Sequence, residues 1–211
     1  MRSERGFSLT EMLVVTAILL IVGSLSIPNL TRAVDNMRLK AAAQQVASIY
    51  QQGRVQATQD ATYHELLTGG AGGSTNQIWL DLDGDGQWDA GEPLAQMPSQ
   101  VLLINQQAVP VQMNPATLGF APLTADSSSG TYNQQGTKVS GLAWNSVGLP
   151  CQRVAPGAIC SNELQAGSVA WVQYLQLQRS VNGALYAAVT VSPTGKIKIW
   201  SYAPGGNGGW F

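Results

Sequence analysis

An uncharged apolar run near the start of the chain, with one carboxylate at its edge, constrains the fold more than any other feature. From Phe7 to Thr31 the only formally charged side chain is Glu11. The uncharged window that begins at Met12 contains 20 residues, about the length that a helix needs to span roughly 30 Å of hydrocarbon. Because a carboxylate beside such a span costs several kcal/mol, Glu11 is expected to have a partner. A cut between Gly6 and Phe7 would supply one, as a free amino group.

Two simpler interpretations of this segment exist. In a secretory signal peptide, Arg2 and Arg5 would form the basic region and the chain would be cut after Ser26. Three observations argue against a signal peptide. The apolar stretch is long, and the helical pattern continues beyond the cut. Glu11 would also oppose membrane insertion and would have no purpose in a segment that is discarded. A plain membrane anchor explains the hydrophobicity but explains neither Gly6-Phe7 nor Glu11.

The segment RGFSLTEMLVVTAILLIVGSLSIPNL resembles the prepilin leader and N-terminal helix of type IV pilins and type II secretion pseudopilins. The resemblance implies that an inner-membrane prepilin peptidase cuts after Gly6 and that Phe7 becomes an N-methylated terminus. It also implies that Glu11 pairs with the terminal amine of a neighbouring subunit during assembly. Pro28 matches the proline that bends the helix in this family, and a proline within a helix interior is expected to kink or loosen it.

The resemblance implies a pilin-like α+β fold, with one long N-terminal helix packed on an antiparallel β-sheet domain. The helix should continue beyond the membrane as an amphipathic segment, because apolar residues recur there at spacings of three and four. The residues expected on its buried stripe are Leu30, Val34, Met37, Ala41, Val46, Ile49 and Gly53. The predicted divisions are a leader (1–6), a transmembrane and assembly helix (7–31), its amphipathic continuation (32–58), a periplasmic β-rich domain (59–202) and a flexible Gly-rich tail (203–211).

Short segments of alternating polar and apolar residues follow the helix, separated by turn residues, as is typical of antiparallel sheet with one packed face. The predicted strands are 77–82, 100–104, 108–113, 138–144, 167–177, 184–191 and 196–202. Residues 69–74 predict a flexible Gly-rich loop, and 124–136 a polar loop.

Two cysteines, Cys151 and Cys160, delimit a short loop. In the oxidising periplasm the natural interpretation is a disulfide. A thiol or metal pair is the alternative, but it lacks further Cys or His nearby. On the loop-entropy model the disulfide contributes about 2 to 3 kcal/mol.

The acidic segment from Asp81 to Glu92 follows the calcium-loop pattern D-x-D-x-D-G-x5-E. The predicted ligands are Asp81, Asp83, Asp85, the Gln87 carbonyl, Asp89 through water, and Glu92. Strand-like residues before the loop and Pro93 after it argue against flanking helices, so a β-hairpin is expected, and calcium binding is one of two interpretations of its carboxylates. The alternative is an acidic turn whose carboxylates accept hydrogen bonds from backbone amides.

Two later patches resemble the GspH/FimT group of pseudopilins and minor pilins. They are the sequences LAWNSVGLP (142–150) and AAVTVSPTGKIKI (187–199). In the second patch, Lys196 and Lys198 occupy the place of a G-R-x-R motif that contributes to DNA binding in FimT-type pilins. Lysine keeps the charge of arginine but loses its bidentate recognition of phosphate. A solvated strand face is the alternative interpretation.

Only 11% of the residues are charged, compared with about a quarter in typical domains. Removing the leader would change the totals from 11 basic and 12 acidic side chains to 9 and 11, which gives no global signature of nucleic-acid binding. His64, the only histidine, has no nucleophile or second base paired with it by a motif, so we expect a structural or exposed residue and no enzyme.

Taken together, the residues and the resemblance favour a minor pseudopilin of the type II secretion pseudopilus. Its expected partners are other pilins or pseudopilins, prepilin peptidase and the inner-membrane assembly platform. It is expected to be a single-pass inner-membrane protein with its globular domain in the periplasm. The alternative is a FimT-like type IV minor pilin that binds DNA for uptake.

Overall fold

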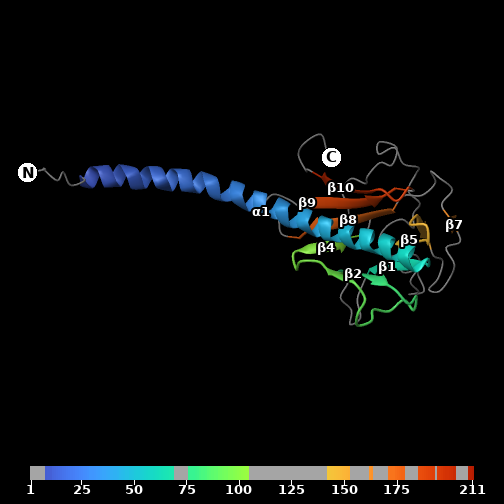
Figure 1. Cartoon of the computed structure of the whole chain (residues 1–211). Coiled ribbons are helices and arrows are strands. Elements are labelled where there is room, and N and C mark those ends of the chain that lie inside the picture. The colour runs from blue at the N-terminus through green and yellow to red at the C-terminus, as the bar shows by residue number, and fades with distance from the viewer. Residues whose placement is uncertain are drawn as a thin grey trace, which may run out of the picture. The chain divides into compact units, whose positions relative to one another are not determined.

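The computed structural model of the chain describes residues 8–68, 76–104, 142–152, 162–163, 171–178, 185–192, 194–202 and 209–211 (Figure 1). The chain divides into two compact units, Met1–Met37 and Arg38–Phe211. One continuous helix, α1 (Leu9–Asp60), supplies the described part of the first unit and the opening segment of the second. The helix continues through position 28.

In the first unit, the apolar side chains of α1 are exposed on every side of the helix. Consecutive apolar positions such as 12–15 and 18–22 are all exposed, and consecutive residues point in different directions because the helix has 3.6 residues per turn. Two polar side chains in this stretch bond back to the helix itself, since the hydroxyls of Thr16 and Ser24 donate to carbonyls three or four residues earlier. No helix within the described part of the chain includes an apolar stretch of sufficient length to cross a membrane.

The buried stripe of α1 starts later than the spacing of apolar residues predicts. Four residues expected on the stripe are exposed: Leu30, Val34, Met37 and Ala41. Among the described residues the first buried side chain is Leu39, and the later members Val46, Ile49 and Gly53 are buried as predicted. The apolar spacing alone could not reveal this difference, because it extends through the first unit, whereas the buried core of the second unit begins only at Leu39.

The strands of the second unit form two antiparallel sheets. The first sheet has the order β3-β2-β1-β5-β6-β7 and the second the order β10-β9-β8-β4. The strands of the first sheet are β1 (His64–Thr68), β2 (Gln77–Asp81), β3 (Leu94–Gln96), β5 (Leu142–Trp144), β6 (Pro150–Gln152) and β7 (Asn162–Glu163). Those of the second are β4 (Val101–Ile104), β8 (Trp171–Leu177), β9 (Leu185–Val191) and β10 (Ile197–Tyr202).

The observed strands agree with six of the predicted segments, and β2, β4 and β10 are each one residue shorter than predicted. The structure confirms strands at β2, β4, β5, β8, β9 and β10. Sequence reasoning missed β1, β3, β6 and β7, which are short or carry polar and proline residues. The strand predicted at 108–113 and the loops predicted at 69–74 and 124–136 lie outside the described residues.

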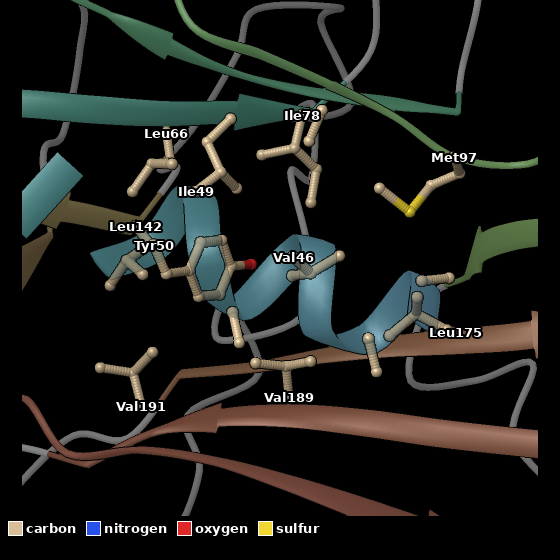
Figure 2. Packing of buried hydrophobic residues seen from close by; sticks show 14 of the residues in the cluster. Val46, Ile49, Tyr50, Leu66, Ile78, Met97, Leu142, Leu175, Val189 and Val191 are labelled. Carbon is tan, nitrogen blue, oxygen red and sulfur yellow. The ribbon is translucent and has the colours of Figure 1, made fainter. Parts of the chain in front are cut away.

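A single hydrophobic core joins the helix to both sheets (Figure 2). Val46 and Tyr50 of α1 lie between residues of the two sheets. Leu66 and Ile78 of the first sheet are on one side, and Val189 of the second sheet is on the other. Burial of such side chains contributes about 1.5 to 3 kcal/mol each. The part of α1 from Leu39 onward therefore packs between the two sheets.

A second cluster covers the other face of the β4, β8, β9 and β10 sheet. Its members are Ile104, Val172, Tyr174, Tyr186, Ala188 and Tyr202, with Leu102, Trp200 and Trp210 packed against them. The end of the chain reaches this cluster, because the Trp210 ring centroid lies 5.3 Å from that of Tyr202 and 5.7 Å from that of Tyr174. The backbone of Phe211 exchanges two hydrogen bonds with Ser201. Within the predicted Gly-rich tail, residues 203–208 lie outside the described residues, and Trp210 and Phe211 dock on β10.

Candidate functional site

Glu11 lies in the first turn of α1, with its side chain exposed. Ser8 precedes the helix and its carbonyl accepts the first backbone hydrogen bond, from the amide of Met12 at 3.2 Å. A carboxylate in the first turn is favoured by the partial positive charge of the helix N-terminus. The predicted cleavage residues Gly6 and Phe7 lie outside the described residues. The geometry therefore describes the Glu11 side of the predicted pair only.

The acidic segment forms the connection of a β-hairpin between β2 and β3, as its flanking residues predict. Asp81 is the last residue of β2 and is buried, with 1% of its surface exposed. Its two carboxylate oxygens accept the amides of Gly84 at 2.7 Å and Gly86 at 3.0 Å. Gly84 and Gly86 have φ angles of 82° and 80°, which favour glycine. The sharp turns of the loop thus bring backbone donors onto Asp81.

Glu92 closes the loop at its other end. One carboxylate oxygen accepts the amide of Leu82 at 2.7 Å, and the other accepts the amide of Asp89 at 3.0 Å. Asp83 accepts the amide of Asp85 at 3.1 Å, and Asp85 in turn accepts the amide of Gln87. Each of these carboxylates thus has a backbone donor. This is the arrangement expected of the acidic-turn alternative.

Three carboxylates of the same loop also lie close enough together to bind one cation. Ligand oxygens of Asp81, Asp83 and Asp85 lie within 4.8 Å of one another, and carboxylate oxygens are the donors that calcium prefers. Burial raises the pKa of Asp81, and the neighbouring charge of Glu92 acts in the same direction, while the amides of Gly84 and Gly86 act against it. The donor set fits calcium and the hydrogen bonds fit the acidic turn, so the calcium site stays a prediction.

Of the predicted disulfide, the structure describes one half. Cys151 lies in β6, is buried and is not a free thiol. It packs with Ala143 and Tyr63 in a small cluster on the first sheet. Cys160 lies outside the described residues, so the pairing of the two cysteines stays a prediction.

In the β9–β10 hairpin, Lys196 directly precedes β10 and Lys198 lies within it, and both side chains are exposed. The ammonium nitrogen of Lys198 lies 3.5 Å from the ring centroid of Trp200, a geometry in which the ring quadrupole attracts the cation. Ile197 and Ile199 alternate with these positions and pack against the main core. The lysines therefore belong to the face of β10 that points away from α1.

Sequence reasoning did not assign a role to Arg54, which the structure places beside this hairpin. Its guanidinium donates to the carbonyl of Gly195 at 3.1 Å and lies 5.8 Å from the ring centroid of Trp144. The only sequence signal was a cation near the end of the helix, and nothing in the pattern connects it to residue 195. Only the fold brings the two together.

His64, predicted to be structural or exposed, is buried at the start of β1. Its Nε2 lies 2.9 Å from a carboxylate oxygen of Asp60 at the end of α1. Its Nδ1 is buried and has no hydrogen-bond partner among the described residues. Hydrogen bonds from Gln56 and His64 lower the pKa of Asp60 below its ordinary value. The contact joins the helix to the first sheet.

No curated protein and no solved structure matches the chain. One family model matches, the prokaryotic N-terminal methylation motif, over residues 1–27. This match confirms the prepilin-type leader that the sequence predicts, and it bears on the start of α1 rather than on the β-sheet domain. The motif indicates a type IV pilin-like protein that is processed by prepilin peptidase and interacts with other pilins.

Proposed function

We propose that this chain is a minor pseudopilin that assembles into a type II secretion pseudopilus. The observation that carries the proposal is the N-terminal methylation motif at residues 1–27, followed by a helix whose first unit has exposed apolar side chains all around it. A helix that is apolar on every side needs an apolar surrounding, either a bilayer or other helices. In the proposed function the bilayer surrounds this part of α1 before assembly, and the helices of other subunits surround it afterwards.

The proposed assembly step is electrostatic. Cleavage after Gly6 creates a positively charged terminal amine on Phe7, and methylation keeps that charge. In an apolar filament core the amine and the Glu11 carboxylate of an adjacent subunit neutralise each other, and removing either one strands the other charge. The exposed position of Glu11 in the first turn of α1 supports a contact between subunits.

In the proposed arrangement, residues 7–31 anchor the chain in the inner membrane before assembly. The uncharged sequence window from Met12 to Thr31 supports this. Arg38–Phe211 then forms the periplasmic part. Its role is mechanical, as an outer surface of the filament, and the proposal assigns it no catalytic step.

The choice of a GspH-like role rests on two sequence patches that lie together in the fold. The patch at 142–150 contains Gly148, and the patch at 187–199 contains Gly195. A methyl group on Gly195 would lie 3.2 Å from the carbonyl oxygen of Gly148. Two patches that resemble the same group and also touch one another support one shared structural unit rather than two chance similarities.

Mass spectrometry of the membrane-derived protein tests the processing step. We expect a mature chain that begins at methylated Phe7. A chain beginning at Ile27 would contradict the proposal, because it would mean that a signal peptidase had removed the first part of α1, with Phe7 and Glu11.

The Glu11→Ala variant tests the assembly step. We expect cleavage to continue while incorporation into filaments falls at least about tenfold, since the amine of the neighbour then lacks its partner. Asp35→Ala removes a carboxylate elsewhere on α1 and serves as the matched control, with incorporation retained. Equal incorporation of both variants would contradict the pairing.

Deleting the gene in the native host should abolish secretion of type II substrates and leave DNA uptake intact.

A second candidate function, DNA binding by a FimT-like minor pilin, is favoured by the β9–β10 hairpin. There, exposed Lys196 and Lys198 accompany Trp200, and Lys198 lies over the Trp200 ring. Cations next to an aromatic ring are the elements that nucleic-acid surfaces combine. A gel shift with double-stranded DNA, comparing the protein with its Lys196→Ala/Lys198→Ala variant, tests this. If both lysines contact phosphates, the slope of log K against log salt should fall in magnitude by about 1.8 in the variant.

A further inference from the structure

Two turns from different sheets share one hydrogen-bond pattern. In the β5–β6 connection, the amide of Asn145 donates to the Leu149 carbonyl at 3.0 Å, and the amide of Gly148 donates to the Asn145 carbonyl at 2.8 Å. In the β9–β10 connection, Ser192 donates to Lys196 at 2.9 Å and Gly195 donates to Ser192 at 2.8 Å. Each turn therefore places its glycine three residues after its first residue, and both glycines have a φ of 78°.

The first side chain of each turn reinforces that pattern. The Asn145 side-chain oxygen accepts the amides of Val147 at 3.0 Å and Leu149 at 2.8 Å. The Ser192 hydroxyl oxygen accepts the amide of Lys196 at 3.0 Å. The glycines are required by their positive φ, where other residues are strained. Each turn is therefore closed by its own backbone and side-chain hydrogen bonds.

The side chain of Arg54 occupies the place where the two turns meet. A methyl group on Gly148 would lie 3.3 Å from its Nε, and one on Gly195 would lie 3.2 Å from its Cζ. Its Nη1 donates to the carbonyl of Gly195 at 3.1 Å. The guanidinium also lies over Trp144 of β5 at 5.8 Å. One side chain of α1 therefore contacts a turn of each sheet.

The chemistry of this contact suits arginine and not lysine. The guanidinium is half-buried, and among the residues described no ion pair engages it. It is held instead by a carbonyl and by the face of an indole ring. A planar fork can bond the carbonyl and stack on the ring at once, whereas a compact ammonium cannot make both contacts. A lysine at position 54 would therefore keep the charge but lose the combined contacts with the Gly195 carbonyl and the Trp144 ring.

We propose that Arg54 is a positioning residue that holds the β9–β10 turn, and with it Lys196, against the β5–β6 turn of the other sheet. The backbone of Lys196 follows directly on Gly195, whose carbonyl Arg54 bonds. Loss of the guanidinium frees the hairpin tip while the buried strands behind it keep their packing. The consequence for ligand binding rests on the second candidate function, but the structural coupling does not.

Hydrogen exchange measured by mass spectrometry on the full-length chain in detergent tests the coupling. In Arg54→Ala and Arg54→Lys we expect peptides covering residues 192–199 to exchange about tenfold faster, as loss of a hydrogen bond to a charged group permits. Peptides from β9 should be unchanged. The matched control is Arg38→Ala, which removes another α1 arginine whose side chain bonds Gln100 at 2.8 Å and should leave residues 192–199 unaffected. Unchanged exchange at 192–199, or an equal rise in β9, would overturn the proposal.

A binding measurement separates positioning from charge. With a double-stranded oligonucleotide as the probe, Arg54→Lys should weaken binding about fivefold despite its conserved charge. Arg38→Ala, which loses a charge, should change binding less than twofold. The opposite order would overturn positioning in favour of a charge effect. If the unaltered protein does not bind the oligonucleotide, the second candidate function fails, and the exchange measurement still decides the role of Arg54.

Discussion

At the scale of single residues, a buried hydrogen bond ties the helix to the second sheet. The indole N–H of Trp171 in β8 donates to the hydroxyl of Tyr50 on α1 at 3.0 Å. Burial raises the pKa of Tyr50 far above its ordinary value, and the bond from Trp171 acts in the opposite direction. The hydroxyl therefore stays neutral and remains an acceptor.

Replacing Tyr50 by phenylalanine keeps most of the volume and leaves the indole N–H of Trp171 buried without an acceptor. We expect the free energy of unfolding to fall by about 1 to 3 kcal/mol, measured by urea denaturation. A double-mutant cycle with Trp171→Phe provides the control, because removing both partners should cost less than the sum of the single changes by about 1 kcal/mol. Strictly additive losses would mean that the bond contributes nothing beyond packing.

Asp60 provides a second residue-scale contact, and this one depends on pH. Gln56 and His64 both bond the same carboxylate oxygen at 2.9 Å, which lowers the pKa of Asp60 below its ordinary value. A carboxylate whose pKa is lower in the folded state stabilises the fold above its unfolded pKa. That contribution is lost as the pH falls through the folded pKa.

Gln56→Ala should therefore raise the pKa of Asp60 toward its ordinary value, because the largest cause of the shift is removed while His64 remains. Asp60→Asn should remove this part of the acid sensitivity altogether. NMR titration of the carboxyl carbon measures the first effect. Urea unfolding at pH 6 and at about pH 3 measures the second. An Asp60→Asn variant that loses as much stability on acidification as the unaltered chain would contradict the assignment.

At the scale of elements, the acidic hairpin was the most predictable part of the β domain. The residues around Asp81 and Pro93 excluded flanking helices, and the structure confirms a hairpin between β2 and β3. The sequence pattern could not distinguish calcium ligation from bonding to backbone amides, because the same carboxylates serve both. The long helix was equally predictable in existence, but the start of its packed region at Leu39 depends on the sheets beneath it.

Isothermal titration calorimetry with calcium tests the hairpin. If the loop binds calcium, Asp83→Asn and Asp85→Asn should each weaken binding at least about tenfold, since ligand charge sets the affinity of such loops. Asp60→Asn, outside the loop, should bind as the unaltered protein does. Absence of binding heat in the unaltered chain would leave the carboxylates with a purely structural role. Asp81→Asn would then still destabilise the hairpin, through weaker acceptors for Gly84 and Gly86.

At the scale of the whole molecule, local and long-range features differed in how far they could be predicted. The N-terminal motif is contiguous, so residues 1–27 carry it without reference to the fold. The pairing of β1 with β5 joins residues about eighty positions apart, and no local pattern specifies it. The approach of Arg54 to Gly195 depends in turn on the arrangement of both sheets.

The division of the chain at Met37 predicts that the second unit folds without the first. Every buried core side chain among the described residues lies at or after Leu39, so removing residues 1–37 removes none of these core side chains. A chain beginning at Arg38 should unfold cooperatively in denaturant, so that circular dichroism and tryptophan fluorescence report the same midpoint. That midpoint should equal the midpoint of the full-length protein.

A chain beginning at Gln44 is the matched control for this boundary. It removes the buried residues Leu39, Ala42 and Ala43, which should lower the free energy of unfolding by about 3 to 4 kcal/mol. Equal stability of the two truncated chains would mean that the first turns of the packed helix contribute little to the core. Loss of cooperative unfolding in the chain that begins at Arg38 would show that the apolar first unit supports the domain as well as assembly.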